Sequence, residues 1–386
     1  MQYRQFGNLD WQVSALGFGC MRFPTVGPNN EIDEPEAIRM VRHAIDQGVN
    51  YIDTAYGYHG GNSERMVAKI LKDGYRAKVR LATKLPPWEV KEAADFDRLL
   101  NEQLAKLQVE TIDYYLLHAL NAESWHKIRD LDVLRWAEGA IADERIRYLG
   151  FSFHDQYEVF QEIVDAYDRW TFCQIQYNYM DEDVQAGTKG LEYAAAKGLA
   201  VVVMEPLLGG KLVNPPEPVQ AIWDLAPVKR GAAEWALQWL WNRPEVSTVL
   251  SGMSTMEQVD DNLASASRST VGLLSGQELG LVAQVAEQYN TLCPIPCTNC
   301  KYCMPCPNGV NIPHNFSLFN NGVMYNAFNQ AREWYGNTAE AERASACIQC
   351  GQCEPKCPQG IAISQWLPVV DRVLGLGEPF AAHMAP

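Results

Sequence analysis

The sequence predicts a mixed α/β chain, a (β/α)8 TIM barrel followed by a smaller, mainly helical domain. Up to about residue 285, short β-branched or aromatic runs alternate with longer segments of helical period, and eight such units occur. Beyond that point nine of the eleven cysteines lie between Cys293 and Cys357. We therefore expect a barrel at residues 1–285 and a cysteine-rich domain at residues 286–386.

The eight predicted strands are short and largely apolar. They are residues 15–18, 51–54, 79–83, 112–117, 148–152, 172–176, 200–204 and 248–251. A doubly wound open sheet is the alternative, but the first unit lacks the Gly-x-Gly-x-x-Gly turn of dinucleotide-binding folds. The two short segments around residues 7–10 predict a hairpin that closes the barrel floor. The Pro-rich stretch 209–229 follows the seventh strand and is predicted to be a long active-site loop.

Composition and charge exclude several classes of function. The 386 residues are 47% hydrophobic, and 32 basic against 47 acidic side chains give a net charge of −15 without a block of basic residues. Nucleic acid and anionic membrane are therefore not expected as partners. No apolar run reaches the roughly 18 residues of a membrane span, and the N-terminus is too polar for a signal peptide. We expect a cytoplasmic protein whose cysteines bind metal or carry redox chemistry instead of forming disulfides.

Four polar side chains fall at the ends of predicted strands. Asp53 closes the second strand, Lys84 the third and His118 the fourth, and Tyr58 follows Asp53 by five residues. Each alone is more often a structural group than a catalytic one. Because the carboxyl ends of parallel strands meet at one rim of a barrel, the four together predict an active site.

The segments GVNYIDTAYGY, LATK and LLH, in this order and spacing, resemble the aldo-keto reductases across essentially the first 285 residues. The resemblance implies reduction of aldehydes and ketones with NADP or NAD, with Asp53, Tyr58, Lys84 and His118 as the catalytic residues. A carbonyl that accepts hydride develops negative charge on oxygen, so Tyr58 is expected to donate a proton there. Lys84 would favour the phenolate, Asp53 would keep Lys84 charged, and His118 would orient the carbonyl.

The resemblance also implies residues that bind the nicotinamide. Ser152 and Gln174 match the contacts to its amide, although the asparagine that usually follows the serine is Phe153 here. Met204 stands where the family usually has an aromatic residue, and its soft thioether side chain can still cover a ring face.

The phosphate-binding segment of the family resembles STVLSGMSTMEQVDDNLA. Ser251 and Gly252 lie at a predicted helix start, where backbone N–H groups suit an anion. Asn262 would contact adenine. Gln258 stands in place of the arginine that binds the 2′-phosphate of NADP, so NADP and NAD both remain open. An ordinary amphipathic helix is the alternative reading of this segment.

The cysteine motifs indicate two [4Fe–4S] clusters. CIQCGQCEPKCP has the C-x2-C-x2-C-x3-C-P spacing of a bacterial ferredoxin, and CTNCKYCMPCP has the same pattern with one residue fewer before the last cysteine. In that scheme three cysteines of one motif share a cluster with the last cysteine of the other motif. The two predicted sets are Cys297, Cys300, Cys303 with Cys357, and Cys347, Cys350, Cys353 with Cys306. Cys293 remains as a substitute ligand, and closed zinc sites are the alternative.

Two functional hypotheses follow from these motifs. Nicotinamide passes two electrons as hydride, whereas iron–sulfur clusters pass single electrons, and no flavin motif is visible. The first hypothesis is an NAD(P)H-dependent carbonyl reductase whose clusters are structural or sense oxygen; the second is an electron-transfer enzyme with a partner. A binding module without catalysis conflicts with the four strand-end residues. Trp88, Tyr56, Tyr179 and the 209–229 loop are candidate walls for a sugar, steroid or phenolic carbonyl substrate.

Overall fold

The computed structural model describes residues 1–386, which form two compact units. The first unit comprises Met1–Gly209 and Ala233–Gly276, and the second comprises Gly210–Ala232 and Gln277–Pro386. The second unit thus begins ahead of the predicted boundary at residue 285. It also contains most of the predicted 209–229 loop.

Polar contacts explain why the segment after Gly209 belongs to the second unit. Lys211 Nζ donates to Asn321 Oδ1 at 3.1 Å. Arg230 Nη1 donates to Glu278 Oε1 at 2.5 Å. The segment also contains a short helix, α8 (Glu217–Trp223). It is therefore a structured part of the second unit.

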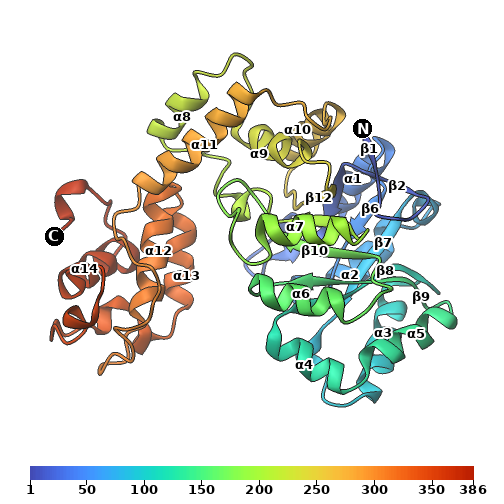
Figure 1. Cartoon of the computed structure of the whole chain (residues 1–386), viewed down its shortest axis with the longest axis horizontal. Helices are drawn as coiled ribbons and strands as arrows, with labels where there is room; N and C mark the ends of the chain where they lie inside the picture. Colours follow the sequence, from blue (N-terminus) through green and yellow to red (C-terminus); the bar gives the residue numbers. More distant parts are fainter. The chain divides into compact units, whose positions relative to one another are not determined.

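The first unit is a closed barrel of eight parallel strands, as predicted (Figure 1). Its strands, in their order around the barrel, are β10 (Phe172–Gln176), β11 (Ala200–Met204), β12 (Val246–Ser251), β3 (Leu16–Gly19), β6 (Tyr51–Asp53), β7 (Arg80–Leu85), β8 (Ile112–Leu120) and β9 (Ile146–Phe153). Strands β10 and β11 match their predicted ranges, and the other six differ from theirs by one to three residues at their ends. Such strands are buried on both faces, which is why runs such as AVVVM are continuously apolar.

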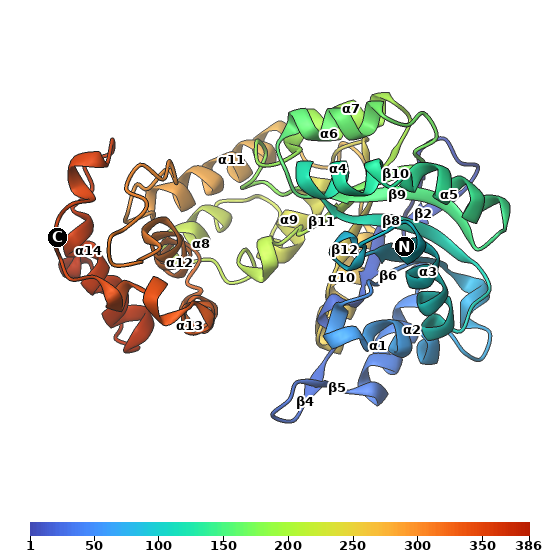
Figure 2. The same ribbon diagram turned by 90° about the horizontal axis from the view of Figure 1, so that it is seen from below.

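Helices surround the barrel on the outside (Figures 1 and 2). They are α1 (Glu34–Asp46), α2 (Ser63–Ile70), α3 (Ala94–Leu107), α4 (Ala122–Asp130), α5 (Val133–Ala142), α6 (Tyr157–Asp165), α7 (Gly187–Ala196), α9 (Ala232–Trp241) and α10 (Met256–Ser267). Their apolar residues recur at helical spacing and pack on the strands. In α1, for example, Met40, Val41 and Ala44 are buried.

An N-terminal hairpin closes the floor of the barrel, as predicted. It consists of β1 (Tyr3–Gln5) and β2 (Gln12–Ser14), which pair antiparallel. Phe6, in its turn, has its ring centroid 4.7 Å from that of Tyr114, and it packs with residues near the starts of other strands. The residues predicted to be catalytic lie at the opposite ends of the strands.

A second hairpin was not predicted. It is formed by β4 (Thr25–Val26) and β5 (Glu31–Ile32) and projects from the barrel before α1 (Figure 2). Its strands have two residues each, so no alternation of apolar and polar residues marks them in the sequence.

The second unit is helical, in agreement with the prediction. Its helices are α8, α11 (Gly276–Thr291), α12 (Ile312–Met324), α13 (Phe328–Asn337) and α14 (Ile363–Val370). Helices α12 and α13 are separated at Asn326, whose backbone is left-handed with φ of 51°. Phe316, Phe319 and Trp366 are part of the core that the cysteine loops pack against. None of the helices in the structure combines the length and apolar character that a membrane span requires.

Candidate functional site

The four predicted catalytic side chains lie on one part of the barrel rim. Asp53 is the last residue of β6, Lys84 lies near the end of β7, and His118 lies near the end of β8. Tyr58 begins a 3-10 turn that leads from β6 towards α2. Because β6, β7 and β8 are parallel neighbours, their carboxyl ends share an edge. The structure therefore brings the four residues together.

The ammonium group of Lys84 is held by three acceptors. Lys84 Nζ lies 2.6 Å from Asp53 Oδ1, 2.8 Å from Thr54 O and 3.5 Å from the hydroxyl oxygen of Tyr58. The three protons of an ammonium group match these three oxygens. Burial favours the neutral amine of Lys84, but the attraction of Asp53 and Tyr58 outweighs it and raises the pKa of Lys84. Lys84 is therefore charged at neutral pH.

Tyr58 is protonated at neutral pH. Burial raises the pKa of its phenol above the usual value, and the neighbouring Lys84 opposes that rise without reversing it. The phenol is thus a proton donor whose conjugate base would lie beside a cation. A group that gives up a proton to a developing oxyanion needs this combination.

His118 is a neutral imidazole beside the phenol. Burial, and then the charges of Lys84 and His154, hold its pKa well below the usual range. Its ring lies edge-on to Tyr58, with 6.1 Å between the centroids, and 5.0 Å from the ring of Trp88. Its buried Nδ1 has no hydrogen-bond partner. A neutral ring with an open nitrogen can hydrogen-bond a polar ligand.

The three residues predicted to bind nicotinamide lie on adjacent strands, β9, β10 and β11. Ser152 pairs in register with Gln174, and Gln176 pairs with Met204. Ser152 Oγ already accepts the N–H of Ala119 at 2.7 Å. Gln174 is buried, and its Oε1 has no partner. A primary amide such as that of nicotinamide would supply the missing donor, so the residues fit this group.

The predicted phosphate segment connects β12 to α10. Asn262 Nδ2 donates to Ser251 Oγ at 3.1 Å, which ties the helix to the end of the strand. Gln258 Oε1 accepts the N–H of Ser254 at 2.8 Å, so this side chain caps the loop. Position 258 therefore supplies a local hydrogen bond and no cation.

Arg22, which the sequence analysis did not select, supplies a cation near this segment. It follows β3, and its carbonyl oxygen accepts a hydrogen bond from Ser254 Oγ at 2.8 Å. A Cβ on Gly252 would lie 2.7 Å from Arg22 Cγ, so only glycine leaves room for the arginine. A Cβ on Gly209 would lie 4.0 Å from Arg22 Nη2, which places the guanidinium near the loop after β11. In the sequence, the only indication that Arg22 lies at the rim is its position shortly after the first barrel strand, β3.

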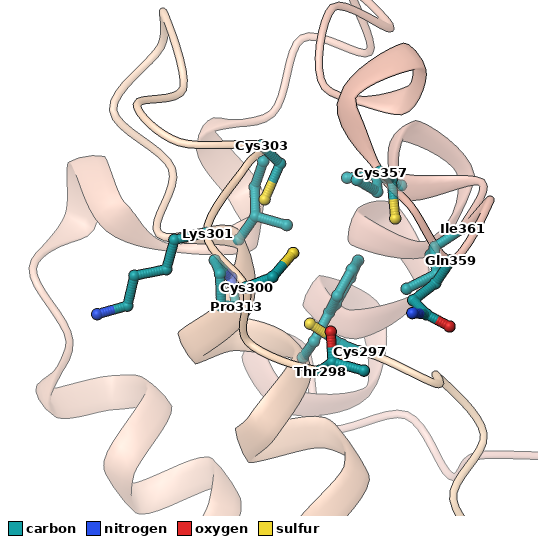
Figure 3. Close-up of a pocket in the computed structure, with 12 residues that line it drawn as sticks. Cys297, Thr298, Cys300, Lys301, Cys303, Pro313, Cys357, Gln359 and Ile361 are labelled. Carbon is teal, nitrogen blue, oxygen red and sulfur yellow. The ribbon is translucent and has the colours of Figure 1, made fainter.

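Four thiols of the second unit surround one pocket. Cys297, Cys300, Cys303 and Cys357 all line it, and their sulfur atoms point towards a common space (Figure 3). Lys301 also lines this pocket, but its side chain extends away from the thiols (Figure 3). Three residues of one motif and the last cysteine of the other thus meet. A four-thiolate cluster requires this arrangement.

The remaining motif cysteines form a second group. Burial raises the pKa of Cys353 to about 11, and the nearby charges of Glu354, Cys347 and Cys306 act in the same direction. Burial raises the pKa of the Cys347 thiol. The N–H of Gln349 opposes this rise, and the nearby Cys306 and Cys350 add to it. These interactions place Cys306 with the 347–353 set. No group of three or more histidine, cysteine or acidic side chains lies close enough together to hold a single metal ion.

The two cysteine loops share one backbone pattern. Asn299 and Lys301 have positive φ in the first loop, as do Gln349 and Gly351 in the second. Cys293 lies outside both loops, and its thiol is directed at the carbonyl oxygen of Ile295 at 3.4 Å.

Comparison with known families identifies both parts of the chain. Residues 15–271 match the sequence profile of the Aldo/keto reductase family. The chain belongs to the aldo/keto reductase family. Residues 296–362 of this aldo/keto reductase match the 4Fe-4S dicluster domain. The predicted fusion of an aldo-keto reductase barrel to a C-terminal two-cluster domain is therefore confirmed.

Relatives of this aldo/keto reductase include enzymes with assigned reactions. L-galactose dehydrogenase of Arabidopsis thaliana is 29% identical over 287 residues, which cover 68% of this chain and 88% of that protein. The 6-dehydroglucose reductase of Novosphingobium aromaticivorans is 27% identical over 227 residues, 55% of this chain and 71% of that protein. Among solved structures, the holo form of aldo-keto reductase AKR11C1 from Bacillus halodurans has a TM-score of 0.61 and 27% identity, covering 74% of this chain and 96% of that one.

Proposed function

We propose that this aldo/keto reductase interconverts an aldehyde or ketone and its alcohol by hydride transfer, with NADP or NAD as cofactor and Tyr58 as general acid. The observation that supports this most strongly is the contact chain from Asp53 through Lys84 to Tyr58. In it, Lys84 Nζ lies 2.6 Å from the carboxylate oxygen and 3.5 Å from the phenol oxygen. His118 lies beside the same phenol.

Each of the four side chains has a distinct role in this proposal. Tyr58 donates its proton to the carbonyl oxygen as negative charge develops there. Lys84 stabilises the resulting phenolate, and Asp53 holds the Lys84 ammonium in place. His118 donates a hydrogen bond that orients the carbonyl and stabilises the oxyanion. In alcohol oxidation the same phenolate accepts the proton.

The cofactor would lie across neighbouring strand ends of the barrel. Ser152 and Gln174 would hold the nicotinamide amide, and the Met204 side chain would cover the ring. When bound, NADPH or NADH supplies the hydride. The supporting observation is the buried Gln174 Oε1, which has no partner in the protein.

The phosphates and adenine would be bound at the β12–α10 segment. Backbone N–H groups near Ser251 and Gly252 suit an anion, and Arg22 provides a positive charge nearby. Asn262 would contact adenine. Gln258 offers no cation to a 2′-phosphate, so NADP and NAD are both accepted as cofactors in this proposal.

A sugar or similar polyhydroxylated carbonyl compound is the proposed substrate class. Two relatives carry names of sugar-converting enzymes, L-galactose dehydrogenase and 6-dehydroglucose reductase. The Trp88 ring is about half exposed and lies 5.0 Å from that of His118. An exposed aromatic face beside the reacting group suits the apolar face of a sugar ring.

The C-terminal unit is proposed to bind two [4Fe–4S] clusters with crossed ligands. Three cysteines of each motif would bind one cluster together with the last cysteine of the other motif. The ligand sets are Cys297, Cys300, Cys303 with Cys357, and Cys347, Cys350, Cys353 with Cys306. When bound, each cluster stores one electron. Because both sets join the two motifs, the clusters would also cross-link this unit.

A second candidate function is electron exchange with a partner. The middle cysteine of each loop, Cys300 and Cys350, is exposed. An exposed apolar side chain stands beside each, Tyr302 at 67% and Ile348 at 68%. If the clusters feed the reaction, chemically reduced protein should turn over substrate without nicotinamide under anaerobic conditions. Failure of that turnover would exclude this candidate.

The Tyr58→Phe variant tests the main proposal. We expect it to abolish nicotinamide-dependent reduction of an aldose panel while the visible absorption of the clusters is unchanged. Tyr75→Phe is the matched control, because Tyr75 lies at the opposite end of the barrel, where its hydroxyl donates to Asp46 at 2.8 Å. Turnover by Tyr58→Phe equal to that of Tyr75→Phe would refute the assignment of Tyr58.

A further inference from the structure

A cluster of buried polar side chains lies between the barrel wall and helices α2 and α3. Glu64, Thr83, Gln103 and Tyr115 have no exposed surface. Gln103 Nε2 donates to Glu64 Oε1 at 2.7 Å, and Gln103 Oε1 accepts the Tyr115 hydroxyl at 2.6 Å. Burying polar groups is costly unless they are hydrogen-bonded, and here they bond mainly to one another. The cluster therefore anchors one strand of the barrel wall, β7, to the two helices.

The anchored point of β7 is the main chain of Lys84. Gln103 Nε2 also donates to Lys84 O at 3.0 Å. Thr83, the preceding residue, donates from its hydroxyl to Glu64 Oε1 at 2.7 Å. Side chains alternate along a strand, so Thr83 points outwards to the helices while Lys84 points to the barrel interior. Gln103 and Glu64 thus hold the backbone from which the Lys84 side chain extends.

Ser63, next to Glu64, is linked through Thr54 to the ammonium end of the Lys84 side chain. Its hydroxyl donates to Cys20 O at 3.1 Å and lies 2.9 Å from Thr54 Oγ1, which must then be the donor of that bond. The carbonyl oxygen of Thr54 is one of the three acceptors of the Lys84 ammonium. Two consecutive residues at the start of α2 are therefore linked to Lys84 through its neighbours: Ser63 through Thr54, and Glu64 through Thr83 and Gln103.

We propose that Gln103, together with Glu64 and Ser63, is a positioning residue that sets the distance between the Lys84 ammonium and the Tyr58 phenol. This inference rests on the proposed function, in which Lys84 stabilises the phenolate. The contact to Tyr58, at 3.5 Å, is the longest of the three that Lys84 makes. A small displacement of the Lys84 backbone breaks that contact first, because 3.5 Å is already at the outer limit of a hydrogen bond.

The Gln103→Met variant tests the proposal because it keeps the size of the side chain and removes its hydrogen bonds. The readout is the pH profile of sugar alcohol oxidation by the full-length, cluster-loaded protein, which rises as Tyr58 ionises. Loss of the Lys84 contact raises the phenol's pKa, so we expect the midpoint to move up by about one pH unit. Oxidation at neutral pH then falls about tenfold, while the alkaline plateau is unchanged.

Gln238→Met is the matched control. Gln238 is also buried, but it lies on α9 and donates to Ser265 O at 2.9 Å. We expect its midpoint to equal that of the wild type. If Gln103→Met does not fold, Ser63→Ala is measured in its place. We expect its midpoint to move up by less than one pH unit.

The outcomes separate this inference from the proposed function. Turnover retained by Tyr58→Phe in the same assay would show that the proposed function fails. Turnover lost in Tyr58→Phe, together with an unshifted midpoint in both Gln103→Met and Ser63→Ala, would overturn only the positioning role. The positioning role would also be overturned if Gln103→Met lost the same fraction of its rate at every pH. A shifted midpoint of the pH profile in the control Gln238→Met would overturn it too.

Discussion

Replacing Lys84 by methionine removes the cation beside a buried carboxylate. Lys84 is 0% exposed and Asp53 is 2% exposed. Removing one partner of a buried ion pair costs about 3–5 kcal/mol, because the other charge is left without compensation. The hydrogen bond to Thr54 O is lost too, at about 1 kcal/mol, and methionine recovers part of the packing. We expect the free energy of unfolding to fall by about 4 kcal/mol.

The loss in Lys84→Met should depend on pH. Without its cation, the Asp53 carboxyl is buried alone, and burial raises its pKa above the unfolded value of about 3.9. The folded state then binds a proton that the unfolded state releases. The free energy of unfolding of this variant therefore falls as pH rises from about 4 towards the raised pKa of Asp53. Adding Asp53→Asn removes the charge, so the double variant should regain most of the stability and lose this pH dependence.

Urea unfolding followed by far-ultraviolet circular dichroism measures these changes. The matched control is Lys78→Met, because Lys78 Nζ lies 2.7 Å from Asp46 Oδ1, nearly the same distance, but both side chains are about half exposed. An exposed pair contributes about 0–1 kcal/mol, so the control should unfold almost like the wild type. The reasoning is refuted if Lys84→Met is as stable as Lys78→Met, or if the double variant is no more stable than Lys84→Met.

Two further variants test the cofactor and cluster sites. In Gly252→Ala the new Cβ would lie 2.7 Å from Arg22 Cγ, so the arginine must move. We expect the Kd for reduced nicotinamide, measured by fluorescence titration, to rise about tenfold, the loss of one charge-assisted hydrogen bond; an unchanged Kd would contradict the role of Arg22. Cys306→Ser should lose the iron bound by the 347–353 set, whereas Cys293→Ser should keep the wild-type content in an iron and sulfide assay. Equal iron in the two variants would argue against the crossed ligand sets.

The barrel could be predicted because its strands carry a strong local signal. Strands buried on both faces are continuously apolar, and β10 and β11 occupy the residues that this pattern predicts. Parallel strands also give each polar residue at a strand end a known place on the rim. That rule was enough to predict that Asp53, Lys84 and His118 would lie near one another.

The contacts that the sequence did not reveal join distant segments. Arg22 precedes the phosphate segment by about 230 residues, and only the closed barrel brings β3 beside β12. Gln103 looks like an ordinary polar residue of an amphipathic helix until its bond to Lys84 O is seen. The segment 209–229 was predicted as a loop of the barrel, but residues 210–232 belong to the second unit. The composition of this segment says nothing about Asn321, to which Lys211 donates a hydrogen bond.

Two buried aspartates show why strand direction separates a reactive carboxylate from a structural one. Asp113 lies at the start of β8, where Arg76 and Arg80 contact its two oxygens at 2.6 and 3.1 Å. Asp53 lies at the end of β6, where it has one cation, Lys84, and an Oδ2 without a partner. The Asp113 carboxylate, held at both oxygens by guanidinium groups, stabilises the floor and keeps these cations in place. A carboxylate that shares a single ammonium with a phenol lets that ammonium respond when the phenol loses its proton. In the sequence both occur as Ile-Asp pairs, and only their positions relative to the strand ends distinguish them.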